Sequence, residues 1–419
     1  MLIHSASQVL TLIGPPQRGH ALGALGIIED GAVLLEGETI IAVGPSREMR
    51  AIYADEEQIN ARGRVVMPGL VDPHTHAVWA GDRSAEFEMR IQGKSYMEIM
   101  NAGGGIVSTV RQTQAASLEE LKTQTRSRLI GMFEQGTTTA EVKSGYGLNT
   151  ETELKMLQAI LELNTEGPLE LVPTFLGAHA IPPEYKDNAD GYTDLVCNEM
   201  LPALKDWWQN QPSTLNLQPF VDVFCETGAF TLAQSRRILA TARELGFPLK
   251  IHADEFDNLN GASLAAELGA ASADHLVVTS LEDMASLGNS DTVAVSLPCT
   301  PFGLAEGHYT SAKDFLDANC ILAIATDMNP GTAWCESMQF AIALACRYLR
   351  LTPAQAIAAA TINAAAAIGK DDKIGSLEPG KQADVLILNA PDYRHLGYRF
   401  GSNLAHTIIK KGHIYPIGD

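Results

Sequence analysis

The sequence predicts an α/β protein: a (β/α)8 barrel of the TIM type, joined to a small β-sandwich domain formed by both chain termini. Two observations lead to this prediction. The middle of the chain alternates short apolar runs with helical stretches, which is the pattern of parallel βα units. The two ends share a different, β-rich character. A chain of 419 residues that is 46% hydrophobic can bury a core of the size that this fold requires.

Eight apolar runs are the expected strands of the barrel. They are Val65–Asp72, Thr137–Val142, Glu170–Leu176, Val221–Cys225, Pro248–His252, Ala273–Val278, Thr292–Leu297 and Ile321–Thr326. Helical stretches such as Ser235–Leu245 and Gly261–Leu268 lie between them. In a barrel of this kind the active site forms at the carboxyl ends of the strands, so residues at those ends are the candidates for function.

The β-rich ends are expected to pair with each other. Residues 32–44 contain two β segments around a Gly-Glu turn, and residues 383–388 and 406–415 have the same character. Because the two ends of a folded chain often lie close together, we expect one composite domain from both. The predicted limits are 1–64 plus 375–419 for this domain and 65–374 for the barrel.

Charge and cysteine content restrict the class of protein. A formal net charge of −20 disfavours binding to nucleic acid or to an anionic membrane surface. The six cysteines form no Cys-x-x-Cys pair, and several lie in apolar runs, as expected for reduced core residues of a cytoplasmic protein. No secretory signal or run long enough to span a membrane is evident. We expect a cytoplasmic protein with a small-molecule substrate, and a homodimer as the commonest assembly.

The tripeptide His74-Thr75-His76 closes the apolar run 65–73 and is the first candidate metal site. Side chains at i and i+2 of a strand point to the same face, so both imidazoles converge at the strand's carboxyl end. Neutral imidazole suits zinc, iron and similar divalent metals. His-x-His alone more often marks a polar loop, and the interpretation therefore depends on further ligands.

Three further candidates also stand at the ends of apolar runs: His252, His275 and Asp327. Imidazoles and one carboxylate match a mononuclear hydrolytic site that leaves one position for water. Asp327 can both approach the metal and accept a proton from that water. His275 is either a ligand or a group that orients the water. Glu255, three residues after His252, is either a proton donor or acceptor for a substrate nitrogen or a solvated surface carboxylate.

Motifs along nearly the whole chain resemble the imidazolonepropionase family of the amidohydrolase superfamily. The superfamily shares the His-x-His motif and the aspartate, whereas Lys-Ser-Gly-Tyr-Gly-Leu (143–148) and Asp-Met-Asn-Pro-Gly (327–331) are more specific. The other matching segments are 72–83, 103–106, 176–180, 223–226 and 273–276. The resemblance implies hydrolytic opening of the cyclic amide 4-imidazolone-5-propanoate to N-formimidoyl-L-glutamate, a step of histidine degradation.

The resemblance also implies roles for individual residues. One divalent metal ion, Zn²⁺ or iron (Fe²⁺ or Fe³⁺), would be bound by His74, His76, His252 and Asp327. Arg83 would hold the propanoate carboxylate, for which a planar guanidinium is well suited. Further contacts to the substrate would come from Tyr146, His179, Glu255, Asn329, Gly331 and Thr332. In the expected reaction His275 orients or deprotonates the water, Asp327 moves the proton, and Glu255 contacts the ring nitrogens.

Two features of the sequence differ from the pattern of the superfamily. Binuclear members carry a carboxylated lysine at the end of the fourth strand, where this chain has Phe224-Cys225-Glu226. We therefore expect one metal, and Glu226 as a bridge to a second ion is a minor alternative. The segment 295–302, at the seventh strand, is more polar than the loop with Gly or Ala that the resemblance implies.

Two other hypotheses remain open from the sequence. The same site could hydrolyse or deaminate a different heterocycle, and Arg83 distinguishes the two because a neutral base has no carboxylate to pair with it. A catalytically silent barrel that acts as a scaffold is the third hypothesis, but such a protein is expected to lose metal ligands. The glycines at 103–105 indicate either a flexible lid within 77–136 or a close backbone approach.

Overall fold

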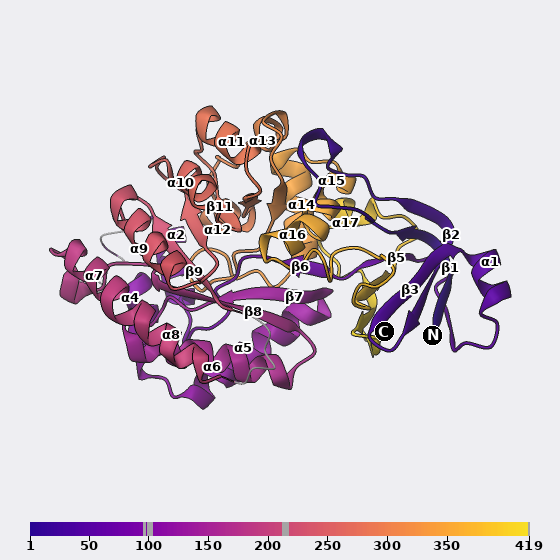
Figure 1. The fold of residues 1–419 in the computed structure, drawn as a ribbon, viewed down its shortest axis with the longest axis horizontal. Helices are drawn as coiled ribbons and strands as arrows, with labels where there is room; N and C mark the ends of the chain where they lie inside the picture. Colours follow the sequence, from indigo (N-terminus) through magenta and orange to yellow (C-terminus); the bar gives the residue numbers. More distant parts are fainter. Residues whose placement is uncertain (95–97, 99–103, 212–217, 418–419) are drawn as a thin grey trace.

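The chain folds into two sheets, which are seen in the computed structural model shown in Figure 1. The structure describes residues 1–94, 98, 104–211 and 218–417. Eight parallel strands surrounded by helices form a nearly closed barrel, and a mixed sheet formed by both termini lies beside it. The predicted fold class is confirmed.

Each of the eight predicted runs contains a barrel strand, although several ends differ by a few residues. The strands are β6 (Leu70–Asp72), β7 (Thr137–Lys143), β8 (Glu170–Ala178), β9 (Phe220–Cys225), β10 (Lys250–Ala253), β11 (Ser272–His275), β12 (Val293–Ser296) and β13 (Leu322–Ile324). Nearly all of their residues are buried, as expected for parallel strands covered by helices on the outside.

The first predicted strand is divided between the two sheets. β5 (Val65–Pro68) pairs with β1 and β14 in the terminal sheet, whereas β6 pairs with β7 in the barrel. Gly69 makes the crossover where the chain passes the Thr138 side chain, and a Cβ at this position would overlap that side chain. Pro68-Gly69 is the local break in the apolar run that marks this change of partner. The predicted domain limits themselves stay a prediction.

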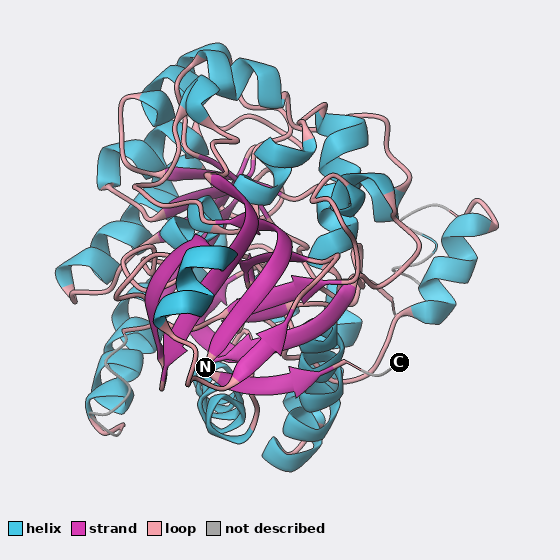
Figure 2. Cartoon of the chain, turned by 90° about the vertical axis from the view of Figure 1, so that its right-hand side faces the viewer, coloured by secondary structure: helices cyan, strands magenta, loops and turns pink. Residues whose placement is uncertain are grey.

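The terminal sheet has the strand order β16-β15-β14-β5-β1-β2-β3, with β4 beside β1. Figure 2 shows this sheet face-on, with the helices of the barrel around it. Its strands are β1 (Leu2–Leu10), β2 (Ile27–Glu36), β3 (Thr39–Pro45), β4 (Gln58–Asn60), β5, β14 (Val385–Leu388), β15 (Ala405–Lys410) and β16 (His413–Pro416). The expected pairing of the two chain ends is therefore present.

The helices other than α1 pack around the barrel or close its ends, and α1 packs on the terminal sheet. They are α1 (Ser46–Ile52), α2 (Ser84–Ile91), α4 (Ile106–Ala115), α5 (Leu118–Glu134), α6 (Thr150–Glu166), α7 (Ala189–Leu195), α8 (Leu201–Gln209), α9 (Leu232–Glu244), α10 (Gly261–Leu268), α11 (Leu281–Gly288), α12 (Cys299–Leu304), α13 (Ala312–Asp317), α14 (Met338–Leu344), α15 (Pro353–Ala359), α16 (Ile362–Ala367) and α17 (His395–Tyr398). Capping boxes at Ser117, Thr231 and Thr352 satisfy free N–H groups where α5, α9 and α15 begin.

None of the helices in the described part of the chain has the length and apolar character needed to cross a bilayer. The glycine run 103–105, for which a lid was one interpretation, lies partly outside the described residues.

A buried ionic cluster joins the amino-terminal end of β8 to the terminal sheet. The Glu170 carboxylate is 2.6 Å from Lys370 Nζ and 3.0 Å from Lys410 Nζ, and Lys410 Nζ is also 2.7 Å from Asp384. Burial raises the pKa of Glu170, but the neighbouring lysines outweigh this and hold it well below its ordinary value. The cluster lies at the opposite end of the strands from the candidate site.

We expect Gly69→Ala to destabilise the protein by about 1–3 kcal/mol, because the added methyl group overpacks against Thr138. Gly307→Ala is the matched control, since its Cβ would meet no heavy atom within 4 Å, and it is expected to change stability by no more than about 0.5 kcal/mol. Urea unfolding of both variants measures the difference. Equal stabilities would mean that the crossover tolerates a side chain.

Candidate metal centre

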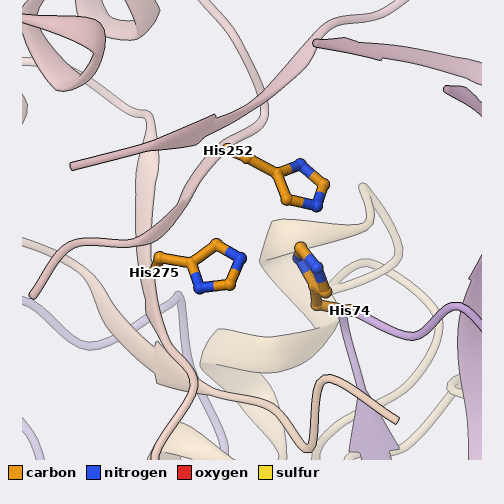
Figure 3. Close-up of side chains that lie close together, drawn as sticks. All are labelled: His74, His252 and His275. Carbon is orange, nitrogen blue, oxygen red and sulfur yellow. The ribbon is translucent and has the colours of Figure 1, made fainter. Parts of the chain in front are cut away.

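Histidines from three barrel strands converge at the carboxyl ends of those strands. His74 and His76 follow β6, His252 lies in β10 and His275 ends β11. Figure 3 shows the rings of His74, His252 and His275 turned towards one space from three separate segments. Asp327 follows β13 and joins His74 and His76 from the other side. The residues that the sequence predicted as a metal site are thus brought together.

The distances between the donor atoms are those of ligands around a single ion. His76 Nε2 lies 3.3 Å from Nε2 of both His74 and His252. Asp327 Oδ1 lies 3.4 Å from His74 Nε2 and 3.5 Å from His76 Nε2. Four donors placed about 2.0–2.1 Å from a zinc ion in a tetrahedron stand about 3.3–3.4 Å apart.

Two aspartates set the orientation of the histidine rings. His74 Nδ1 donates to Asp274 Oδ2 at 2.7 Å, so its Nε2 carries the lone pair. His252 Nδ1 lies 2.9 Å from Asp222 Oδ2, an ionic contact in which the N–H is poorly aligned for a hydrogen bond. The lone pairs of His74 and His252 therefore face His76 Nε2, which can supply at most one proton to two acceptors. A cation resolves this arrangement, and the donor set fits a divalent metal.

Asp327 presents one oxygen to the histidines and holds the other in a hydrogen bond. Thr300 Oγ1 donates to Asp327 Oδ2 at 2.5 Å, whereas the buried Oδ1 has no hydrogen-bond partner. Burial raises the pKa of Asp327 to about 7 in the metal-free protein, against hydrogen bonds and neighbouring charges that lower it. Burial also holds the pKa of His74 and His76 well below the ordinary value, so both rings are neutral and available to a metal at pH 7.

His275 and Glu255 lie side by side on the rim. His275 Nδ1 is 3.6 Å from Glu255 Oε2, and burial followed by the charges of Asp327 and Glu226 raises the pKa of Glu255 well above its ordinary value. The Glu255 side chain is only 10% exposed and lies at the site, so it is not a solvated surface carboxylate.

Glu226 has a different role from the metal bridge considered for it. Its carboxylate accepts hydrogen bonds from the backbone N–H groups of Phe256 at 3.0 Å and Thr227 at 2.7 Å, and it also accepts from Asp257. Both carboxylate oxygens are thereby engaged with the turn that follows Glu255. Glu226 fixes this turn, and in the described part of the chain it belongs to none of the groups of side chains that could hold an ion.

Tyr146 and His179 lie on the same rim as the histidines. The His179 ring stacks on that of His76 with centroids 4.8 Å apart, and its Nδ1 donates to the Gly145 carbonyl at 2.9 Å. The loop that carries Tyr146 is held by the buried Glu153 carboxylate, which accepts from the N–H groups of Gly145, Gly147 and Leu148 at 2.7–2.9 Å. Burial and the Asp327 charge raise the pKa of Tyr146, so its hydroxyl stays protonated and can donate.

Arg83 is held in place by Glu86. Its Nε and Nη2 both donate to Glu86 Oε2, at 2.9 and 2.7 Å, and Glu86 Oε1 accepts from the Gly105 N–H at 3.0 Å. The remaining Nη1 edge packs closely on Gly331, where a Cβ would overlap it. Among the described residues, Arg83 donates hydrogen bonds from Nε and Nη2, and Nη1 is the edge without such a bond.

A short turn after β13 carries the other predicted contacts. Asn329 Oδ1 accepts from the N–H groups of Gly331 and Thr332, both at 2.8 Å, and Asn329 Nδ2 donates to the Asp327 carbonyl at 2.7 Å. This turn and Arg83 line a hollow of about 510 Å³ that also contains Arg90. Arg90 Nη2 donates to the Gly331 carbonyl at 2.9 Å. Asn329, Gly331 and Thr332 therefore form one hydrogen-bonded unit beside Asp327.

Non-glycine residues with left-handed backbone gather at this rim. They are Leu148 (φ 54°), Asp254 (φ 56°), His275 (φ 82°), Leu276 (φ 60°) and Asp327 (φ 54°). Such conformations cost roughly 1–3 kcal/mol each and persist where the surrounding structure fixes them, which is common at functional sites.

Several residues of the site were not identified from the sequence. They are Glu86, Glu141, Lys143, Glu153, Asp222, Lys250, Asp274 and Thr300. Most of these charged residues lie inside strands whose neighbours are apolar, and a charge in such a run is the signal that could have identified them. The unusual polarity of 295–302 pointed to Thr300, but no local pattern connects it with Asp327.

The chain matches the amidohydrolase family over residues 65–414. It is 54% identical over 417 residues to an imidazolonepropionase of Herpetosiphon aurantiacus, covering 98% of this chain and 97% of the relative. An imidazolonepropionase of Chloroflexus aggregans is 51% identical over 417 residues, covering 99% of this chain and 98% of the relative.

Solved structures with the same fold are much more distant in sequence. An atrazine chlorohydrolase of Arthrobacter aurescens in complex with zinc and atraton has a TM-score of 0.70 at 16% identity, covering 99% of this chain and 94% of that chain. Guanine deaminase of E. coli has a TM-score of 0.68 at 15% identity, covering 99% of both chains. At these identities the likeness shows the fold alone.

Metal binding to the metal-free protein is expected to release protons in a pH-dependent way, because Asp327 must lose its proton before it can bind the ion. With a pKa of about 7, Asp327 is mostly protonated at pH 6 and mostly ionised at pH 8. Titration calorimetry with Zn²⁺ in two buffers of different ionisation enthalpy should show more protons released at pH 6 than at pH 8. Asp327→Asn should release about one proton fewer at pH 6. The same release at both pH values in the unaltered protein would contradict this assignment.

Proposed function

The chain belongs to the amidohydrolase family and to its imidazolonepropionase branch, and from that premise we propose how its site performs the reaction. It is a metal-dependent hydrolase that acts on a carbon–nitrogen bond of a cyclic amide. The substrate is a small molecule, 4-imidazolone-5-propanoate, and the product is N-formimidoyl-L-glutamate. The observation behind the proposed assignment of residues is that His74, His76, His252 and Asp327 lie together at the carboxyl ends of the barrel strands, in overlapping groups that could hold a metal ion.

We propose that these four side chains hold one divalent ion, either zinc or iron. The unpartnered Asp327 Oδ1 and the mutually facing Nε2 atoms support this ligand set. When bound, such an ion polarises a carbonyl oxygen and lowers the pKa of a water molecule. Nitrogen and oxygen donors suit both metals, so the choice between them is left to measurement.

The reaction adds water across the ring C–N bond. A C–O bond forms at the carbonyl carbon, the C–N bond breaks, and one proton passes from water to the departing nitrogen. We propose that His275 orients the water or takes its proton and that Asp327 moves a proton between water and product. Glu255 contacts the ring nitrogens, and its raised pKa favours the protonated form, which can donate a proton.

The propanoate carboxylate is the part of the substrate that distinguishes it from other heterocycles. We propose that the Nη1 edge of Arg83 binds this carboxylate. Tyr146 and His179 contact the ring or the product from the loops after β7 and β8, and Asn329, Gly331 and Thr332 line the side next to Asp327. The hydrogen bonds that fix Arg83 and the Asn329 turn support a preorganised pocket.

The two other hypotheses have less support. A different heterocyclic substrate would leave the Arg83 guanidinium without its anionic partner. A silent scaffold would not need metal ligands, whereas this chain brings His74, His76 and Asp327 together as such a group. We also infer a cytoplasmic location, which the unpaired cysteines support. A homodimer stays a prediction based on the frequency of two-fold symmetry.

The direct test of the function is ring opening of freshly generated 4-imidazolone-5-propanoate, followed by its loss of absorbance, with and without a chelator. We expect rapid turnover that the chelator abolishes and that added Zn²⁺ or Fe²⁺ restores. A metal-replete protein that does not open this ring, but does hydrolyse another cyclic amide or amidine, would contradict the assigned substrate.

Arg83→Ala is expected to raise KM for imidazolonepropanoate by about two orders of magnitude or more, because the carboxylate loses a charged hydrogen-bonding partner and Glu86 is left unpaired. Arg83→Lys keeps the charge but not the planar guanidinium, so its KM should lie between that of the unaltered enzyme and that of Arg83→Ala. Arg236→Ala, which removes an exposed ion pair on α9, is the control. Steady-state kinetics with an unchanged KM for Arg83→Ala would exclude Arg83 from substrate binding.

Glu255→Gln is expected to lower kcat by about 100-fold or more, with a smaller change in KM, because general acid catalysis contributes on this scale. The acid form of Glu255 is the active one, so activity that depends on it is lost as pH rises through its raised pKa. The alkaline limb of the kcat profile should therefore disappear in Glu255→Gln. Glu306→Gln is the control, since Glu306 is an exposed carboxylate that lies near Glu255. If both variants keep the profile of the unaltered enzyme, Glu255 is not the proton donor.

A further inference from the structure

Five charged side chains are buried together inside the barrel beneath the histidines. They are Glu141 and Lys143 on β7, Asp222 on β9, Lys250 on β10 and Asp274 on β11, and each has no exposed surface. The interior of such a barrel is usually packed with layers of branched apolar side chains. Burying charges is costly unless each is paired and hydrogen-bonded. The contacts of this cluster show what the charges do.

Lys143 joins the two aspartates that orient the histidines. Its Nζ lies 2.8 Å from Asp222 Oδ2, the same oxygen that faces His252 Nδ1 at 2.9 Å. It also lies 3.7 Å from Asp274 Oδ2, the oxygen that accepts from His74 Nδ1. Burial lowers the pKa of Lys143, but the surrounding carboxylates outweigh this and raise it above its ordinary value, so the side chain is a cation.

Lys250 fixes the same group from the other side. Its Nζ donates to the carbonyl of Pro73, the residue before His74, at 2.7 Å. It lies 2.9 Å from Glu141 Oε2 and 3.7 Å from Asp274 Oδ2. Glu141 Oε1 accepts from Lys143 at 2.8 Å, so this carboxylate bridges the two lysines. Thr174 Oγ1 donates to the same oxygen.

We propose that Lys143 and Lys250 are positioning residues for the metal centre, which they keep in its binding geometry by holding Asp222, Asp274 and the Pro73 carbonyl against the histidine ligands. The proposal rests on the ligand set given under the proposed function. The two ammonium groups approach the particular oxygens that face His74 and His252, which general packing of a barrel interior does not require. The lysines touch no substrate, and they act through the aspartates.

The competing explanation is that the cluster only stabilises the barrel. In that case removing a lysine would lower stability without a specific effect on the metal. Lys370 offers a matched comparison, because it is also buried and pairs with Glu170 at 2.6 Å, at the amino-terminal end of β8 and away from the ligands. Lys370→Met removes a buried ion pair of the same kind.

The test compares Lys143→Met, Lys250→Met and Lys370→Met by two measurements that do not depend on turnover. The first is the Zn²⁺ affinity of the purified protein in competition with a chelator. The second is the visible absorption spectrum of the Co²⁺-loaded protein, which responds to ligand geometry. We expect Lys143→Met and Lys250→Met to bind Zn²⁺ about 10–100-fold more weakly and to change the Co²⁺ spectrum. Lys370→Met should match the unaltered protein in both.

Zn²⁺ affinities and Co²⁺ spectra that are the same in all three variants and the unaltered protein would overturn the proposal. If Lys143→Met does not fold, Glu141→Gln replaces it in the same two measurements. This variant keeps the shape of the cluster and weakens the bridge between the lysines, so it should also bind Zn²⁺ more weakly and change the Co²⁺ spectrum. Because neither measurement uses the substrate, this outcome is separate from that of the ring-opening assay. An unaltered protein that binds Zn²⁺ but opens no ring would contradict the proposed function and leave the positioning role intact.

Discussion

The rest of the structure depends on one constraint: donor atoms that repel each other without a cation must be held within about 3.5 Å. His76 Nε2 lies 3.3 Å from Nε2 of His74 and of His252, and Asp327 Oδ1 lies 3.4–3.5 Å from Nε2 of His74 and His76. Lone pairs in this arrangement repel each other, and so the protein has to supply rigid support on every side. Aspartates behind the rings, buried lysines behind the aspartates and strained backbone at the rim can each be understood as such support.

The barrel closes at this same point. β6 and β13 are the two ends of the sheet, and they are joined beyond their last residues by the bridge between Thr75 and Met328. The His76 N–H donates to the Met328 carbonyl at 2.9 Å, and the Asp327 N–H donates to the His74 carbonyl at 3.1 Å. Asp72 reinforces the seam by accepting from the Thr326 hydroxyl at 2.5 Å. Closure of the barrel therefore sets the distance between the His-x-His motif and Asp327.

The sequence was sufficient for the fold class and for most of the residues on the rim, because strand ends carry a local signal. An apolar run that stops at His252 or at Thr326-Asp327 can be recognised without any knowledge of its partners. Contacts across the barrel carry no such signal. Thr300 with Asp327, Glu86 with Arg83 and Lys143 with Asp222 became evident only from the folded chain. The division of the first strand at Gly69 has a local signal in Pro68-Gly69, but that dipeptide does not show that the two halves pair in different sheets.

We propose that one metal ion is bound by His74, His76, His252 and Asp327. The most direct measurement is a crystal structure of the Zn²⁺-loaded protein with anomalous data collected on both sides of the zinc edge. We predict a single anomalous peak about 2.0–2.2 Å from the Nε2 atoms of the three histidines and from Asp327 Oδ1. A peak elsewhere, for example among Glu141, Asp274 and His74, or a second peak at Glu226, would contradict the account.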